Sequence, residues 1–127
     1  MPLPTLILLP EALSICRLAP GSSLPEPPEN GFWSLTQTAD ELSLVCPTKD
    51  VPGVSQRRED GWRALRVAGT LDFSLVGILA PILRSLAEAE ISVFTLSTYD
   101  TDYLLLKDTV LEKAVRTLIA SGYPVES

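Results

Sequence analysis

Residues 92–118 read SVFTLSTYDTDYLLLKDTVLEKAVRTL, and this stretch decides the fold of the second half of the chain. The apolar and β-branched runs at 92–97 and 103–107 predict two strands, and the polar residues 99–102 predict the turn that joins them. The segment Thr109-Val110-Leu111-Glu112 has the spacing of a capping box, which predicts that a helix begins there. The helix continues with an apolar stripe that consists of Leu111, Ala114, Val115 and Leu118.

The residues on both sides extend this pattern to a small complete domain. Residues 63–71 alternate between apolar and polar positions, which predicts a strand with one buried face. Residues 75–89 carry apolar side chains at helical spacing and predict an amphipathic helix. Gly122 predicts the end of the second helix, and residues 123–125 follow as a last short strand. The order is βαββαβ, which is the ferredoxin-like α+β arrangement of a sheet with two helices on one face.

The first sixty residues contain strand signals and no helix signal. Short apolar runs at 3–9 and 12–18 predict two strands, and residues 32–38 and 41–46 predict a hairpin. Residues 47–61 are polar and contain proline and glycine, so we expect a linker there. The predicted domains are a mostly β unit and the βαββαβ domain, at residues 1–61 and 62–127.

Charge and hydropathy exclude several classes of function. The 127 residues carry a net charge of −6, which weighs against binding to nucleic acid or to an anionic membrane surface. No apolar run approaches the roughly 20 residues of a membrane helix. The apolar run at residues 3–9 lacks the basic start and the length of a signal peptide. We therefore expect a cytoplasmic protein that binds neither nucleic acid nor membrane.

The side chains that enzymes need are sparse. The chain has no histidine, which removes the commonest general base and the commonest zinc ligand. Asp100 and Asp102 have the spacing that starts an EF-hand loop, but leucines occupy its glycine and final glutamate positions. Cys16 and Cys46 lie in apolar runs and are expected to be buried free thiols. We expect no catalytic residue, no metal site and no cofactor, and hence no enzyme.

Several segments of the second half resemble an ACT domain, the small regulatory domain of aspartate kinases. They are Gly77-Ile78-Leu79-Ala80, Leu86–Val93, Ser97–Leu106 and Leu111–Val115. The hairpin Ser-Thr-Tyr-Asp-Thr-Asp is similar to that of small bacterial ACT proteins and of the arginine-sensing CASTOR family of animals, in which ACT units occur in pairs. Residues 31–34 and 40–47 resemble the degenerate first unit of those proteins. Many ACT domains have Asp-x-Pro-Gly after the first strand, and here only the glycine, Gly77, matches.

The resemblance implies that a small amino acid binds where the strand–helix turn of one unit faces another unit. The free N–H groups and partial positive charge of a helix N-terminus suit the α-carboxylate of such a ligand. Its ammonium group needs a carboxylate, which Asp100 or Asp102 in the hairpin can supply. The expected ligand-binding residues are Asp72, Phe73, Ser74, Gly77, Ile78, Ser97, Thr98, Tyr99, Asp100 and Asp102. Purely structural roles are the alternative, such as helix packing for Gly77 and a turn for Asp100.

The function that the resemblance implies is that of a sensor. A free amino acid binds between ACT units, the chain pairs as a homodimer, and the effect passes to a separate, unidentified protein partner. The alternative is an interaction module that dimerises through the ACT fold without a ligand. The presence of Gly77 together with Asp100 and Asp102 favours the sensor.

Overall fold

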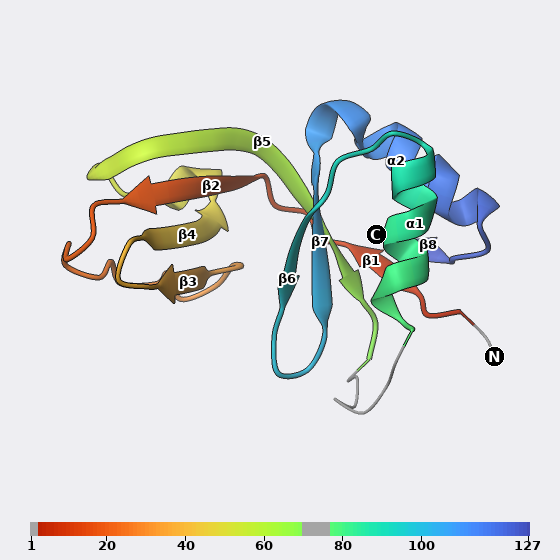
Figure 1. Cartoon of the computed structure of the whole chain (residues 1–127), viewed down its shortest axis with the longest axis horizontal. Coiled ribbons are helices and arrows are strands. Elements are labelled where there is room, and N and C mark those ends of the chain that lie inside the picture. Colours follow the sequence, from red (N-terminus) through yellow and green to blue (C-terminus); the bar gives the residue numbers. More distant parts are fainter. Residues whose placement is uncertain (1–2, 70–76) are drawn as a thin grey trace. The chain divides into compact units, whose positions relative to one another are not determined.

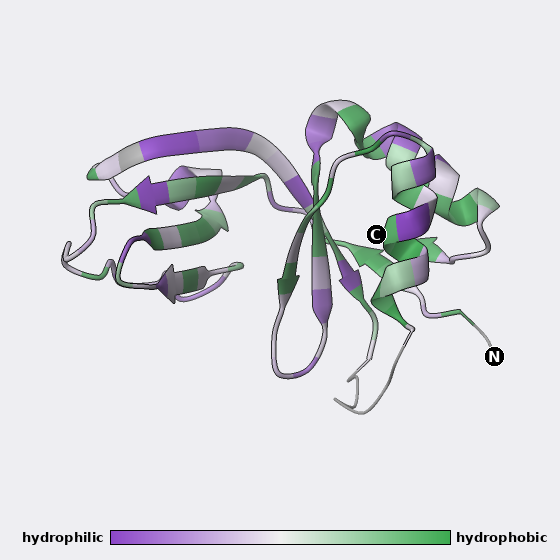
Figure 2. Cartoon of the chain, in the orientation of Figure 1, coloured by the Kyte–Doolittle hydropathy of each residue, from purple (hydrophilic) through white to green (hydrophobic). Residues whose placement is uncertain are grey.

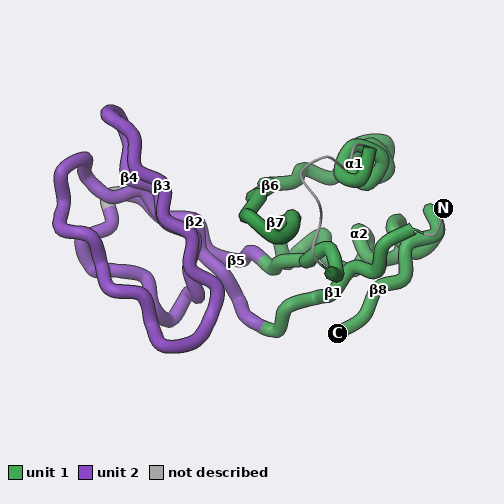
Figure 3. The backbone as a smooth tube through the Cα atoms, turned by 90° about the horizontal axis from the view of Figure 1, so that it is seen from below, with its two compact units in different colours: residues 1–10, 63–127 green, residues 11–62 purple. Residues whose placement is uncertain are grey.

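The chain forms two compact units. The computed structural model describes residues 3–69 and 77–127 (Figure 1). Unit 1 comprises residues 1–10 and 63–127, and unit 2 comprises residues 11–62 (Figure 3). The expected division after residue 61 does not account for the first ten residues, which group with unit 1.

Unit 1 contains the expected βαββαβ order. Its elements are the C-terminal part of β5 (Ser55–Val67), α1 (Leu79–Glu88), β6 (Phe94–Ser97), β7 (Asp102–Lys107), α2 (Asp108–Ala120) and β8 (Val125–Glu126). The ferredoxin-like α+β class that the sequence predicts is confirmed by this order. Within the described ranges, neither helix combines the length and the apolar character needed to cross a membrane.

An additional strand, β1 (Leu6–Leu8), completes the sheet of unit 1. It pairs antiparallel with β5, with Leu6 opposite Val67, and parallel with β8, with Leu6 opposite Val125. The strand order in unit 1 is therefore β6-β7-β5-β1-β8. The prediction that this strand belongs to the first domain is wrong. A short apolar run carries no local sign of which sheet it joins, so the sequence could not place it.

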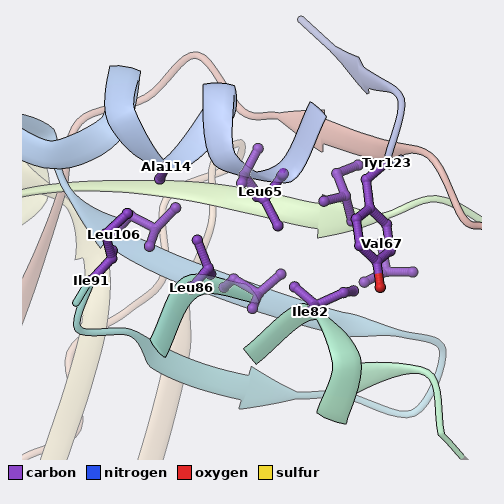
Figure 4. Close-up of a cluster of buried hydrophobic side chains, with 11 residues drawn as sticks. Leu65, Val67, Ile82, Leu86, Ile91, Leu106, Ala114 and Tyr123 are labelled. Carbon is purple, nitrogen blue, oxygen red and sulfur yellow. The ribbon is translucent and has the colours of Figure 1, made fainter. Parts of the chain in front are cut away.

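The core of unit 1 lies between the sheet and the two helices. Because side chains alternate along a strand, Leu65 and Val67 of β5 point to the same face of the sheet. Ile82 and Leu86 of α1 pack against that face (Figure 4). The buried cluster consists of Leu6, Leu65, Val67, Ile82, Leu86, Ile91, Leu104, Leu106, Ala114, Leu118 and Tyr123.

Helix α2 ends as expected but begins differently. Gly122 follows it with a φ of 100°, the left-handed conformation that ends many helices. The predicted capping box is wrong: α2 begins at Asp108, and no side chain caps its first turn. Thr109 and Glu112 lie inside the helix, and Glu112 forms an ion pair of 3.3 Å with Arg116 one turn later.

Unit 2 is a small antiparallel sheet. Its elements are β2 (Leu13–Leu18), β3 (Ser34–Gln37), β4 (Leu42–Pro47), the 3-10 turn η1 (Thr48–Asp50) and the N-terminal part of β5. The strand order is β3-β4-β2-β5, and the predicted hairpin is confirmed as the antiparallel pair β3–β4. The described residues of unit 2 contain no α-helix.

The predicted linker at residues 47–61 is wrong in its second half. From Ser55 onward the chain is strand, and β5 pairs with β2 from Ser55 to Trp62. This part of β5 is mostly hydrophilic (Figure 2). Residues 57–60 are all exposed, so the strand shows no alternation of apolar and polar side chains that would predict it.

Cys16 and Cys46 lie in the core of unit 2 as free, buried thiols. Burial raises the pKa of both thiols, and the pKa of Cys46 rises from 9.0 to about 12. Because the thiolate is the reactive form, a thiol reagent at neutral pH should label the native protein far more slowly than the unfolded chain. Labelling of the native protein at the unfolded rate would contradict the burial of these strands.

The raised pKa of Cys46 also predicts how stability depends on pH. In the unfolded chain this thiol ionises near pH 9.0, whereas in the folded chain it stays protonated until about pH 12. The free energy of unfolding should therefore fall as the pH rises above 9.0, by at most about 1.4 kcal/mol per pH unit. Urea unfolding of the parent and of Cys46→Ala over this range measures the effect, and the variant should show the flatter profile.

Candidate functional site

Three elements of unit 1 meet at one end of its sheet. Strand β5 ends there at Val67, α1 begins there, and the turn between β6 and β7 lies at the same end (Figures 1 and 4). A buried hydrogen bond ties the turn to the strand, because the Thr101 hydroxyl donates to the carbonyl oxygen of Val67 at 2.7 Å. Of the predicted site residues, Asp72, Phe73 and Ser74 lie outside the described residues.

The start of α1 has the features of an anion-binding helix end. Helix α1 begins at Leu79 and not at Leu75 as predicted, since Gly77 has a φ of 76° and cannot continue a helix. Ile78 occupies the N-cap position, no side chain of the described residues caps the helix, and the first turn has no acidic residue. Pro81 lacks an N–H group, so Leu79 and Ala80 carry backbone N–H groups of this turn that have no partner within the helix.

The structure gives a different reason for the glycine at position 77 from the one that the sequence suggests. The sequence suggests that Gly77 allows a ligand to approach the backbone closely or eases helix packing. A Cβ atom at this position would have no described atom within 4 Å, so packing does not require glycine. The positive φ of this residue does require glycine, because other residues rarely adopt a positive φ. Ile78, next in the chain, is half-buried and packs against the core of unit 1.

The hairpin brings Ser97 and Asp102 together. They are opposite each other in the antiparallel pair β6–β7, and the Ser97 hydroxyl donates to Asp102 Oδ1 at 2.5 Å. Asp102 is two residues from Leu104, a member of the core beneath the helices. Side chains two apart share a face of the sheet, so the Asp102 carboxylate lies on the side that α1 and α2 cover.

The other predicted residues of the hairpin form its turn. The Thr98 N–H donates to the carbonyl oxygen of Thr101 at 2.8 Å, and the Thr98 hydroxyl bonds to the backbone of Thr101 at 3.2 and 3.4 Å. Tyr99 and Asp100 are exposed at the tip, with 80% of Tyr99 accessible. The structure therefore separates the two aspartates: Asp102 lies at the base of the hairpin and Asp100 at its tip.

Sequence reasoning missed Thr101. It lies between two aspartates in a polar turn and carries no signal of its own, yet only 6% of it is exposed. Its burial follows from the pairing of β7 with β5, which are far apart in the sequence.

This end of the sheet has negative charge on the hairpin and partial positive charge at the start of α1. Residues 97–102 contain two aspartates and no lysine or arginine. The uncapped start of α1 offers partial positive charge from its N–H groups. Such an arrangement is complementary to a zwitterion that has a carboxylate and an ammonium group. Within the described ranges, no group of three cysteine, aspartate or glutamate side chains is placed to hold a metal ion.

Comparisons with known family models and with curated proteins agree on one family. Residues 57–120 match the family model of the ACT domain, and residues 11–54 match a second model that describes an N-terminal domain. Among curated proteins, the chain is similar to subunit 1 of the cytosolic arginine sensor for mTORC1 from Homo sapiens and Bos taurus. The identity is 31%, and the match covers 68% of this chain and 30% of each relative.

Solved structures extend the likeness to the whole chain. A crystal structure of an Agobacterium tumefaciens protein has a TM-score of 0.89 and 31% identity, and the match covers 100% of this chain and 96% of that one. The aspartokinase alpha and beta subunits have a TM-score of 0.65 at 17% identity, over 94% of this chain and 97% of that one, which shows a shared fold. The βαββαβ order and the match to residues 57–120 lead to one conclusion: the chain belongs to the ACT domain family.

Proposed function

We propose that the chain is a regulatory protein that binds a free amino acid, and that it is not an enzyme. The observation that carries the proposal is the position of Asp102, on the helix-covered side of the sheet and at the end where α1 begins uncapped. The N–H groups of α1 receive the α-carboxylate of the ligand, and Asp102 receives its ammonium group.

The Ser97–Asp102 hydrogen bond prepares the carboxylate for this role. The Ser97 hydroxyl occupies one acceptor position on Oδ1 and orients the group. An ionised carboxylate has about four acceptor positions, so others remain for an ammonium group. Gly77 and Ile78 shape the carboxylate end, while Thr98, Tyr99 and Asp100 form the turn that borders the ligand.

The proposal includes an assembly. Two chains form a cytoplasmic homodimer, a second ACT unit from the partner chain closes the site, and the liganded dimer acts on a separate protein. The similarity to a protein named as a cytosolic arginine sensor supports the cytoplasmic and sensing parts of this proposal, and the chain spans 30% of that relative's length. Light scattering should give twice the chain mass of 13.8 kDa, and a monomer at tens of micromolar would contradict the dimer.

A thermal-shift screen against the proteinogenic amino acids tests the function. An amino acid that binds only the native state, at a hundred times its dissociation constant, stabilises by roughly 2.7 kcal/mol. For a chain of this size the melting temperature should rise by several degrees. Glycolate and simple amines, each with one of the two charged groups, are the matched controls and should give smaller shifts. If no amino acid shifts the transition, the site does not bind one and the interaction module becomes the better account.

A further inference from the structure

Thr101 is a buried polar residue at the point where the hairpin meets β5. Within the described ranges, the buried polar side chains are those of Ser14 and Thr101, and Ser14 belongs to unit 2. The Thr101 hydroxyl donates to the carbonyl oxygen of Val67, and the bond joins residues 34 positions apart. Val67 is the last residue of β5, so this bond lies where the chain leaves the sheet toward α1.

The bond lies at the end of a strand that is paired on both sides. On one side of β5, Val67 is opposite Leu6 of β1. On the other side β5 pairs with β7, which begins at Asp102, the residue after Thr101, so the hydroxyl of Thr101 bonds to Val67 at the point where this pairing begins. Loss of a buried hydrogen bond is costly, which makes this end of the sheet sensitive to the hydroxyl at position 101.

The same residue also holds the turn that carries Asp102. The carbonyl oxygen of Thr101 accepts from the Thr98 N–H at 2.8 Å, and its own N–H donates to the Thr98 hydroxyl at 3.4 Å. Through its side chain and its backbone, Thr101 thus connects both sides of the hairpin to the end of β5. Asp102 is the next residue and begins β7, so the bond from Thr101 to β5 lies directly beside it.

We infer that Thr101 is a positioning residue of the amino-acid site, which holds the β6–β7 hairpin in register with the end of β5 from which the chain continues to α1. The inference rests on the proposed function. Thr101 itself does not touch the ligand; its hydroxyl fixes the distance between the group that binds the ammonium and the helix start that binds the carboxylate. Without the hydroxyl, the hairpin samples other positions, and only a fraction of the molecules is competent to bind.

The test compares four variants by calorimetry, with the proteinogenic amino acids as probes, at a temperature where every variant is fully folded. Thr101→Val keeps the shape and removes the hydroxyl, and Thr101→Ser keeps the hydroxyl. Thr101→Ala also removes the hydroxyl, but it does not add the second methyl group that valine has. It replaces the valine variant if that variant fails to fold. Thr95→Val is the matched control, because Thr95 is an exposed residue of the same hairpin, opposite Leu104.

Thr101→Val and Thr101→Ala should weaken binding by about tenfold, while Thr101→Ser and Thr95→Val stay close to the parent. Parent-like binding by Thr101→Ser would show that the hydroxyl matters and that the methyl group does not. The measurement on fully folded protein ensures that weaker binding does not reflect a loss of stability. Parent-like affinity of the valine and alanine variants would overturn the inference and leave the proposed function standing. Absence of binding to the parent itself would overturn both.

Discussion

Asp102→Asn should weaken amino-acid binding by roughly tenfold to a hundredfold, because a hydrogen bond to a charged group contributes about 1.5–3 kcal/mol. The substitution keeps the shape of the side chain and an oxygen that can accept from Ser97, which bonds to Asp102 at 2.5 Å in the parent. The melting temperature of the unliganded variant should therefore stay near that of the parent. Isothermal calorimetry with each amino acid that shifts the parent measures the loss.

Asp100→Asn is the matched control for this result. It removes the same charge from the same hairpin, but Asp100 is exposed at the tip of the hairpin and solvent screens it. Its effect on affinity should be small. Equal losses in the two variants would mean that the hairpin acts through its net charge, and an unchanged affinity of Asp102→Asn would place the ammonium elsewhere.

Leu86→Ala should lower the free energy of unfolding by about 2–5 kcal/mol, because it removes a fully buried side chain and leaves a cavity. Leu86 lies in α1 and packs between this helix and the sheet of unit 1 (Figure 4). Urea unfolding followed by circular dichroism measures the change. Ile119→Ala in α2 is the control, since 54% of Ile119 is exposed and its truncation should have little effect.

A loss below 1 kcal/mol for Leu86→Ala would show that the core around α1 can collapse around the missing atoms. It would also weaken the argument about the site, which needs a rigid α1. The start of this helix can hold a carboxylate only if the helix itself has a fixed place on the sheet.

Hydrophobic periodicity made the βαββαβ part of unit 1 predictable. Alternation at residues 63–67 of β5, the apolar run of β7, and helical spacing in α1 and α2 are local properties, and the side chains that they place on one face form the core of unit 1. The predicted ends of elements were less accurate where a single residue decides them. Helix α1 begins later than predicted because Gly77 has a positive φ. Helix α2 begins at Asp108, before the predicted capping box, which does not form.

Pairing between distant strands was not predictable. Nothing in the run at residues 3–9 indicates that β1 lies between β5 and β8, and nothing in the charged residues 57–60 indicates a strand. The candidate site follows the same rule. The hairpin residues could be chosen from their motif, whereas the different positions of Asp100 and Asp102 and the burial of Thr101 depend on register.

The place of β1 has a consequence for the order in which the chain folds during synthesis. Strand β1 pairs with β5 and β8, which are both synthesised much later than β1 itself. Unit 2 is continuous in sequence and can form while β1 still waits for its partners. The sheet of unit 1 is complete only after β8 has been added, when all of unit 2 has already been synthesised. Pulse-labelled hydrogen exchange on refolding protein should accordingly show protection of β2 and β4 before β1, and simultaneous protection would exclude this order.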